Sequence, residues 1–458
     1  MAPPTTFQAP KGLRDLYPID AAKRRFITEA WRSTSLRHGF EEVDGPTFEQ
    51  IELYTAKSGD AIVSEIFGVF SGKDEEELTR LTQTRQAPYA LRPEFTPTLA
   101  RLYAARAGSL PKPTKWFMSG PFFRAERPQR GRLREFLQWN VDMLGDSSPQ
   151  ADAEVIACCV SLMRSLGFTP QDLRVKINHR SALQEWLRSI GIVDAAHAAL
   201  FKLLDQRGKM PAPVFAQQIA AFGFTPAQAE VFQKGIVRVT VDDPAAPPAV
   251  PGAVPESVVD LTYFSHAVMP LAQQLVQAGV IDWVDFDLSI VRGLAYYTGM
   301  VFEVHEAGGN DRAVAGGGRY DNLVEVFGGP PTPAVGFGMG DVVLSLVMQD
   351  KGLWPDDSGV LRATGLAPDV FVISNGTPEA EVLLRPVVAR LRAAGLHTRH
   401  TYKTTKNVGK LIQEAVGLRA RVALILESAT TASIKDLGTS VQTGPFPLEV
   451  ALGMVGVK

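Results

Sequence analysis

The sequence predicts an α+β chain of three parts: a domain built on antiparallel strands, a helical insertion and a C-terminal α/β domain. Apolar residues from Trp116 to Phe123 and a second strand-like segment from Phe136 to Leu144 flank a polar turn, which is the pattern of a hairpin. Ala-rich helical patterns lie within 184–255. Strands and helices of short, even length alternate beyond residue 368, which is typical of an α/β domain with a largely parallel sheet.

The predicted boundaries follow changes of composition. Prolines between Pro244 and Pro251 give the insertion a stiff exit, and turn residues between Gly352 and Pro368 break the pattern before the last domain. The predicted parts are 1–183 and 256–352 for the first domain, 184–255 for the insertion, 353–367 for a linker and 368–458 for the C-terminal domain.

Single elements can be placed within these parts. A helix is predicted over 20–38, because apolar residues recur on one face and Gly39 gives a stop signal, and a strand over 40–43 follows it. Helical patterns in the insertion lie around 195–204 and 215–232. In the last domain the predicted elements are a strand over 369–374, a helix over 378–394, a strand over 396–400, a helix over 403–415 and a strand over 421–426.

Composition bounds the class of protein. The chain has 458 residues, of which 45% are hydrophobic and 21% charged, and its net charge of −2 gives no overall polyanion-binding signature. Its two cysteines, Cys158 and Cys159, are adjacent, which suits neither an ordinary disulfide nor a spaced zinc site. The sequence has neither a signal-peptide pattern nor an apolar run of membrane-spanning length, so we expect a cytoplasmic protein without membrane contact.

The hairpin carries five arginines: Arg124, Arg127, Arg130, Arg132 and Arg134. A guanidinium group is permanently charged and binds phosphate oxygens through a planar fork, so several on one hairpin suit a nucleoside triphosphate. Nothing here resembles a phosphate-cradling glycine loop followed by lysine. A solvated basic hairpin is the plain alternative to a phosphate site.

Three further segments count against that alternative. Residues 91–101 place a carboxylate and two hydroxyl groups in a proline-punctuated loop before a short amphipathic helix, and such a loop can hold an ammonium group. Residues 291–299 contain an arginine and a tyrosine pair, and residues 315–321 contain three glycines that permit close approach of a ligand. Taken singly, a glycine run is more often a turn and a tyrosine pair more often core.

In this order the segments resemble the class II aminoacyl-tRNA synthetases, and within them the histidyl-tRNA synthetases of class IIa. Residues 124–129 resemble motif 2, residues 291–299 the histidine-specific segment, and residues 317–321 the glycine-rich strand after it. The predicted helix and strand over 20–43 resemble motif 1, which implies a homodimer. The resemblance implies an antiparallel catalytic sheet of about six or seven strands flanked by helices, a helical insertion and a C-terminal α/β anticodon-binding domain.

The resemblance also implies roles for residues that bind ATP. Arg124 is expected at the α-phosphate and the amino-acid carboxylate, with Phe136 stacked on adenine and Glu126 near its exocyclic amine. Arg132 is expected at the outer phosphates or the acceptor stem of the tRNA, together with Arg134. No protein metal site is expected, and Mg²⁺ is expected to accompany ATP.

The histidine pocket is implied in the same way. Glu94, Thr96 and Gln138 are expected to hold the α-amino group, and Asp142 and Tyr297 to bond the two imidazole nitrogens. An apolar ligand of the same shape would leave the buried polar groups of this pocket without hydrogen-bond partners. Such a pocket would therefore favour histidine over an apolar ligand. The remaining expected residues are Tyr296 and Tyr320, which line the pocket, and Arg292, which faces Arg124 across the reacting centre and stabilises the pentavalent phosphorus.

The chain departs from the family pattern at motif 3. Residues 335–344 resemble that motif but carry Val343 where an arginine that grips the γ-phosphate is expected. The Gly-Asp ending of this segment and Ala295 before the tyrosine pair resemble a plant-organelle-like branch of the family. Either Arg132 or Arg319 is expected to supply the missing charge.

The predicted function is therefore histidine–tRNA ligase activity, with ATP, L-histidine and the histidine tRNA as substrates. A competing interpretation is a non-catalytic histidine-sensing paralogue such as the regulatory subunit of ATP phosphoribosyltransferase, which Val343 favours and the C-terminal domain disfavours. A third interpretation, a structural RNA-binding protein, leaves the polar pocket unexplained.

Overall fold

The structure is a computed structural model that describes residues 7–58, 60–84, 86–205, 210–225, 236–237, 262–287, 290, 297–307, 313–403 and 405–457. The chain divides into two compact units. The first contains Met1–Asp15 and Ala30–Leu353, and the second contains Leu16–Glu29 and Trp354–Lys458. The predicted boundaries at residues 183, 255 and 367 stay predictions.

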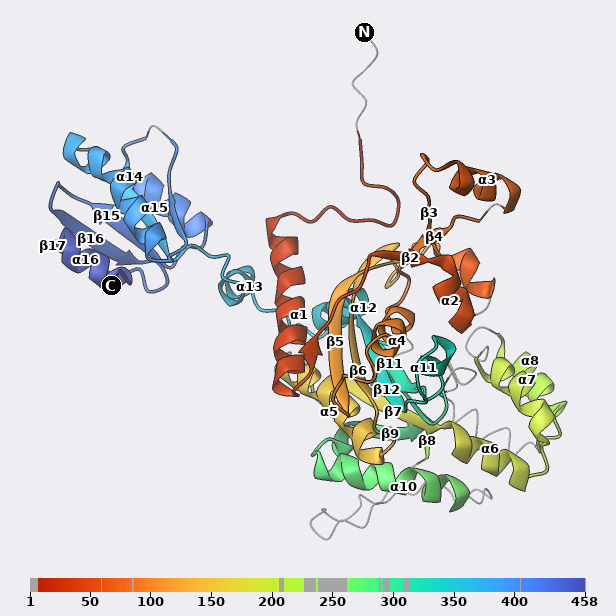
Figure 1. The fold of residues 1–458 in the computed structure, drawn as a ribbon. Helices are drawn as coiled ribbons and strands as arrows, with labels where there is room; N and C mark the ends of the chain where they lie inside the picture. The colour runs from red at the N-terminus through yellow and green to blue at the C-terminus, as the bar shows by residue number, and fades with distance from the viewer. Residues whose placement is uncertain are drawn as a thin grey trace, which may run out of the picture. The chain divides into compact units, whose positions relative to one another are not determined.

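A nine-stranded sheet forms the centre of the first unit (Figure 1). Its strands, in spatial order, are β1 (Glu41–Glu42), β5 (Thr114–Phe123), β6 (Glu135–Leu144), β12 (Ala334–Gly340), β11 (Ala315–Arg319), β10 (Met300–Glu306), β7 (Leu173–His179), β9 (Val284–Asp287) and β8 (Ile236–Val237). Every pairing from β5 to β7 is antiparallel, as predicted. The expected strand count was wrong, because β1 and β9 extend the sheet by parallel pairing and β8 adds a further antiparallel strand at the end.

The arginine-rich hairpin is confirmed as β5 and β6. Its register runs from Thr114 opposite Leu144 to Phe123 opposite Glu135. At the tip, the Arg132 amide donates to the Gln129 carbonyl at 2.8 Å, and Gly131 adopts a φ of +75° that glycine accepts readily. The paired strands therefore end at Phe123 and Glu135, and the connection that carries the arginines closes in a separate tight turn over 129–132.

Alternation along β6 sends its side chains to two different environments. Trp139 packs on one face against Trp31 of α1 (Pro18–Arg37), with ring centroids 6.2 Å apart, and α5 (Pro149–Ser165) covers the same region. On the other face, Leu144 joins a core made with Leu99 of α4 (Thr96–Ala104) and Val324 of α11 (Leu323–Val326). The sheet is thus flanked by helices, and Gln138, Asn140 and Asp142 of β6 are on the same face as Leu144.

Smaller elements frame that second face. β2 (Phe48–Gln50), β4 (Tyr89–Leu91) and β3 (Gly68–Val69) make a three-stranded antiparallel sheet. Next to it lie α2 (Ile51–Ser58), η1 (Asp60–Glu65) and α3 (Glu75–Thr84). Buried Ile51, Tyr54 and Ala90 hold α2 against the small sheet.

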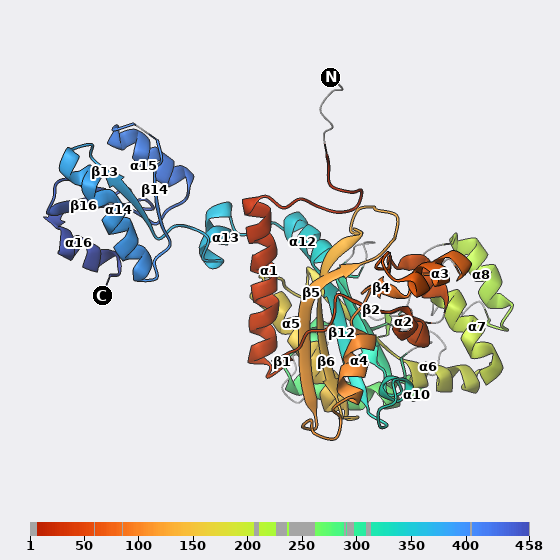
Figure 2. The ribbon, with the colours of Figure 1, turned by 45° about the horizontal axis from the view of Figure 1, so that its top comes forward.

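Three helices follow β7: α6 (Arg180–Ser189), α7 (Asp194–Asp205) and α8 (Ala212–Ala220). Figures 1 and 2 both show α7 and α8 lying side by side. Trp186, Leu200 and Phe215 contribute one buried cluster from the three helices. The helix predicted over 195–204 is confirmed, whereas α8 covers only the start of the pattern over 215–232, of which 226–232 lies outside the described residues. Further helices of the first unit are α10 (Thr262–Gln277), η3 (Ile281–Trp283) and α12 (Asp341–Asp350).

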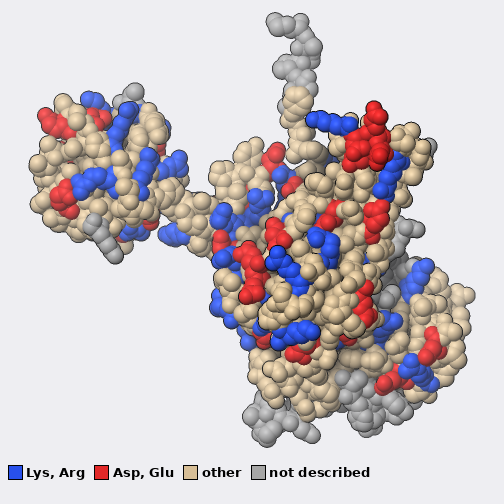
Figure 3. Space-filling model, viewed as in Figure 1, with Lys and Arg blue, Asp and Glu red and all other residues tan. Residues whose placement is uncertain are grey.

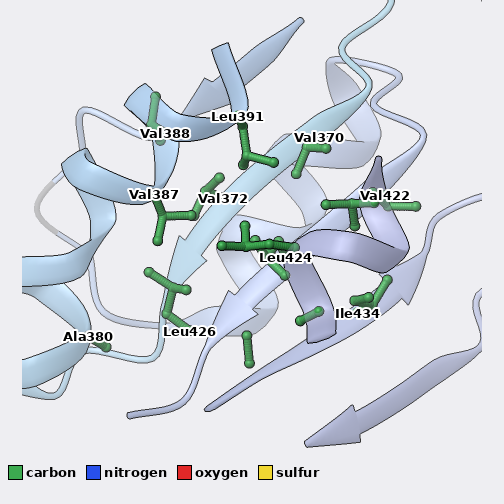
Figure 4. Close-up of a cluster of buried hydrophobic side chains, with 14 residues drawn as sticks. Val370, Val372, Ala380, Val387, Val388, Leu391, Val422, Leu424, Leu426 and Ile434 are labelled. Atoms are coloured by element: carbon green, nitrogen blue, oxygen red, sulfur yellow. The ribbon is translucent and has the colours of Figure 1, made fainter. Parts of the chain in front are cut away.

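The second unit holds a five-stranded sheet ordered β14 (Thr398–His400), β13 (Val370–Ser374), β15 (Val422–Leu426), β16 (Thr431–Asp436) and β17 (Gln442–Pro447). Its helices are α13 (Asp357–Ala363), α14 (Pro378–Ala393), α15 (Val408–Gly417) and α16 (Leu448–Val455). Figure 4 shows Val387 and Leu391 of α14 turned toward Val372 and Leu424 of the sheet. The prediction of a largely parallel sheet holds for β14, β13 and β15 and is wrong for β16 and β17, which pair antiparallel.

In the part of the chain that the structure describes, no helix combines the length and the apolar character needed to cross a membrane.

Candidate active site

A cavity of about 520 Å³ opens on the second face of the large sheet. Every predicted site residue that the structure describes lines it: Glu94, Thr96, Arg124, Glu126, Arg132, Phe136, Gln138, Asp142, Tyr297 and Tyr320. The two others, Arg292 and Tyr296, lie outside the described residues. Segments that are more than 200 residues apart in the chain thus meet in one cavity.

The floor of the cavity is made by β6 and its neighbour β12. Phe136, Gln138 and Asp142 are two or four residues apart on β6, so the pleat turns them to one face. A methyl group at Gly336, opposite Asp142, would lie 2.0 Å from Asp142 Oδ1, and one at Gly338 would lie 2.3 Å from Gln138 Nε2. The glycines of β12 therefore make room for the polar side chains of β6.

The arginine-rich end of the cavity lies where the connection between β5 and β6 begins and ends. Arg124 Nε donates to the Pro93 carbonyl at 3.1 Å, and the Arg124 guanidinium lies 5.2 Å from the centre of the Phe136 ring. Arg132 Nη1 pairs with Glu126 Oε2 at 2.5 Å. Two guanidinium groups, an aromatic face and a carboxylate are therefore gathered where the hairpin leaves the sheet, a set that suits a nucleotide.

The opposite end is acidic and more deeply buried. Tyr320 Oη donates to Asp142 Oδ1 at 2.5 Å, and Asp142 is only 3% exposed. Among the described residues, Asp142 Oδ2 has no hydrogen-bond partner. Burial raises the pKa of Asp142 to about 7, against the opposing effects of the Tyr320 hydrogen bond and the Lys57 charge. Asp142 thus offers an acceptor that releases its proton near neutral pH.

Tyr297 stands beside this acidic end. Burial, followed by the negative charges of Glu94, Asp142 and Glu303, raises the pKa of Tyr297 well above its ordinary value. Its hydroxyl group therefore stays protonated at neutral pH. The backbone that carries it is fastened from outside the cavity, since Arg180 Nη1 donates to the Tyr297 carbonyl at 2.6 Å and Thr298 Oγ1 donates to Asp321 Oδ2 at 2.9 Å.

The structure also adds lining residues that the sequence did not single out. They include Lys57, whose ammonium group pairs with Glu94, and also Asn140, Phe302 and Glu303. Asn140 and Glu303 could have been found from strand geometry. Asn140 follows the lining residue Gln138 by two positions on β6, and Glu303 lies opposite the lining residue Gly316. The local sequence does not single out Lys57, because a lysine near the end of a short helix is normally predicted to be a solvated surface residue.

Of the two arginines expected to compensate for Val343, the structure places only one at the cavity. Arg132 and Val343 both line it. Arg319 is 6% exposed and donates from Nε and Nη2 to Asp152 Oδ1 at 2.9 and 2.6 Å. Its Nη1 donates to the Asp146 carbonyl at 3.0 Å. The expectation that Arg319 could serve the phosphates is therefore corrected, because its charge is committed to a buried ion pair behind the sheet.

Comparison with known proteins agrees with this geometry. A family model described as histidyl-tRNA synthetase matches residues 12–340. The chain is 34% identical over 454 residues to the histidine–tRNA ligase of Opitutus terrae, covering 98% of both chains. It is also 34% identical over 347 residues to the chloroplastic/mitochondrial histidine–tRNA ligase of Arabidopsis thaliana, covering 76% of this chain and 67% of that one. The bacterial and the plant organellar relative are therefore equally identical to it over the aligned residues.

A solved structure extends the likeness to the fold. The crystal structure of histidyl-tRNA synthetase from Nostoc has a TM-score of 0.75 to this chain, covers 99% of both chains and is 22% identical. The family model spans the hairpin, the loop before α4 and the glycine-rich strands that build the cavity. The chain therefore belongs to the histidyl-tRNA synthetase family.

Proposed function

We propose that this chain is a histidine–tRNA ligase that activates L-histidine with ATP to histidyl-adenylate and transfers it to the 3′ end of the histidine tRNA. The observation that carries this proposal is the polarity of the cavity. Guanidinium groups and the Phe136 ring gather at one end, and Glu94 and Asp142 lie toward the other. Histidyl-adenylate has the matching polarity, with a nucleotide at one end and an ammonium group and an imidazole at the other.

Histidine would be recognised at the acidic end. Glu94, Thr96 and Gln138 hold the α-ammonium group, Asp142 accepts the N–H of one ring nitrogen, and the Tyr297 hydroxyl bonds the other. Tyr320 supports this arrangement because its hydrogen bond fixes the orientation of the Asp142 carboxyl group. An amino acid without ring nitrogens would leave the buried Oδ2 atom of Asp142 without a hydrogen-bond donor, which disfavours that amino acid by about 1–3 kcal/mol or more.

ATP would be held at the arginine-rich end. Phe136 would offer a face for adenine, and Arg124, whose guanidinium lies 5.2 Å from the centre of that ring, would bind the α-phosphate. Arg132 would exchange Glu126 for the outer phosphates, and Glu126 would then be available to the adenine amine. Arg132 would then supply the positive charge that the family's arginine would provide at position 343, since Arg132 and Val343 line the same cavity.

Adenylate formation is then a displacement at the α-phosphorus. A carboxylate oxygen of histidine forms a bond to phosphorus while the bond to the pyrophosphate leaving group breaks. Arg124 and Arg292 would neutralise the charge on the pentavalent phosphorus from opposite sides. In the second half of the reaction, the terminal ribose hydroxyl of the tRNA attacks the histidyl carbonyl and releases AMP.

Magnesium would enter with ATP and neutralise part of the triphosphate charge. The described carboxylates of the cavity already have protein partners, since Glu94 pairs with Lys57, Glu126 with Arg132, Asp142 with Tyr320 and Glu303 with His305. This donor set favours an ion held by the phosphate oxygens of ATP over one held by the protein.

The proposal further includes that the chain binds the histidine tRNA, forms a homodimer and is located in the cytoplasm. On the face shown in Figure 3, lysine and arginine side chains are interspersed with aspartate and glutamate. Contacts with the tRNA would therefore depend on local groups such as Arg134 of the hairpin and on the second unit, which would bind the anticodon. A second copy would pair through the motif 1 elements α1 and β1.

Charging of the histidine tRNA tests the proposal. The purified chain should attach labelled histidine to that tRNA in the presence of ATP and magnesium, and should attach no other amino acid. Histidine binding without charging would contradict the ligase function and favour the histidine-sensing alternative.

A further inference from the structure

Lys57 stands in the acidic end of the cavity on the helix α2. Its side chain is 11% exposed and pairs with Glu94, whose side chain is 19% exposed. Both residues line the cavity. An ammonium group with so little water around it is held in place by its partner, because a desolvated charge is costly unless it is paired.

The surroundings of Lys57 explain why a cation is needed there. Burial raises the pKa of Tyr297 most, and the negative charges of three carboxylates, those of Glu94, Asp142 and Glu303, raise it further. Glu303 has a partner of its own, since His305 Nε2 lies 2.7 Å from Glu303 Oε2. Like charges gathered in a site of low dielectric disfavour one another's ionised form. Without a cation, the carboxylates of the acidic end would tend to take up protons.

Lys57 acts on both of the carboxylates that are assigned to histidine. It pairs directly with Glu94 Oε2, and its charge opposes the burial that raises the pKa of Asp142. α2 is held against the small sheet by the buried Tyr54 and Ile51, so Lys57 reaches the cavity from a fixed element.

We propose that Lys57 is a positioning residue that fixes Glu94 through one carboxylate oxygen and favours the ionised form of Asp142, so that histidine meets two acceptors. This inference rests on the proposed function, in which Glu94 receives the α-ammonium group and Asp142 the ring N–H. Lys57 itself acts through these carboxylates and not on the reacting atoms.

The arrangement leaves room for the substrate. A carboxylate has about four lone-pair sites on two oxygens, so Glu94 Oε1 can accept the α-ammonium group while Oε2 keeps Lys57. The charges then balance, because the ammonium groups of Lys57 and histidine face the carboxylates of Glu94 and Asp142. Lys57 is in this way a partner of substrate binding and not a competitor for Glu94.

The polar and charged groups around Asp142 must be considered together. Those of the described residues that face the acidic end are Lys57 from α2, Glu94 from the loop before α4, Asn140 from β6, Glu303 from β10, and Tyr297 and Tyr320 beside β11. Lys57 is the cation whose charge lowers the pKa of Asp142. Removing it should therefore move the pH dependence of histidine binding upward.

Direct binding to the full-length chain tests this inference. Calorimetric titrations between about pH 6 and pH 9 would use histidine and triazolylalanine, whose ring takes up no proton in this range. Lys57→Met and Lys57→Gln should weaken binding of both ligands about 10- to 100-fold near pH 7 and shift the midpoint of the pH profile upward. Lys57→Arg keeps the charge and should restore most of the affinity and the original midpoint.

A matched control is Lys351→Met, because Lys351 Nζ pairs with Glu306 at 2.7 Å in a partly buried ion pair that does not line the cavity. It should leave affinity and midpoint unchanged. Thermal unfolding identifies a misfolded variant, and Lys57→Gln, which can still bond Glu94, decides the matter if Lys57→Met does not fold.

Equal or tighter binding by the charge-removing variants, or an unchanged pH midpoint, would overturn the inference and make Lys57 a competitor or a purely structural residue. Failure of the wild-type chain to bind histidine would instead count against the proposed function. The two failures are therefore distinguishable.

Discussion

Replacing Asp142 with asparagine should make the fold less sensitive to rising pH while weakening histidine binding. Burial raises the pKa of this carboxyl group to about 7 from 3.8. In the unfolded chain it should titrate near its ordinary value. Between about pH 4 and pH 7 the folded protein therefore holds a proton that the unfolded chain has released, so the free energy of unfolding falls as the pH rises through this window.

The magnitude follows from the shift. Each unit of pKa corresponds to about 1.4 kcal/mol, and integration from pH 5 to pH 8 gives a loss of about 3 kcal/mol from Asp142 in the wild-type chain. Asparagine does not ionise, so the variant lacks this loss. Its side-chain oxygen can still accept the hydrogen bond that Tyr320 Oη donates to Asp142 Oδ1.

Urea unfolding of the full chain at about pH 5 and pH 8, followed by tryptophan fluorescence, measures the effect. The stability of Asp142→Asn relative to wild type should rise by about 3 kcal/mol between the two pH values. Asp350→Asn, which changes a carboxylate whose side chain is 43% exposed, is the control and should show no such rise. A difference between Asp142→Asn and wild type that is the same at both pH values would refute the reasoning.

Two further predictions concern the cavity and the sheet that carries it. Arg132→Ala should lower kcat/KM for ATP by roughly 100-fold without unfolding the chain, whereas Arg319→Ala should destabilise it by about 3–5 kcal/mol, because it leaves Asp152 buried and unpaired. Steady-state kinetics measures the first effect and urea unfolding the second. An unchanged kcat/KM for ATP in Arg132→Ala would contradict the role of Arg132 at the outer phosphates. Gly338→Ala should raise KM for histidine by displacing Gln138 Nε2, whereas Gly317→Ala should unfold the sheet, since its methyl group would lie 2.1 Å from a backbone oxygen. Equal stability of the two glycine variants would contradict this distinction.

Much of the site was predictable because its residues sit in short segments with a strong local pattern. The hairpin was confirmed because its apolar strands and its turn at Gly131 are local features of the sequence. Residues 94 and 96 line the same cavity as Asp142, and only family resemblance could predict this, since these segments meet only in three dimensions.

Other features depend on tertiary structure, which local patterns do not encode. Lys57 becomes a partly buried member of the cavity wall only because its ammonium group meets Glu94, a pairing between residues 37 positions apart. Arg319 looks equivalent to Arg132 in the sequence, and only the fold places Asp152 next to it. The parallel pairing of β1 with β5, at residues 41 and 116, likewise joins segments whose register no local signal sets.

The most direct test of the central claim is histidine-dependent exchange of labelled pyrophosphate into ATP by the purified chain. Exchange requires that histidine and ATP form an adenylate reversibly in this cavity. We predict exchange with histidine and with no other amino acid, and its loss in Arg292→Ala. Histidine binding without exchange in the wild-type chain would contradict the account.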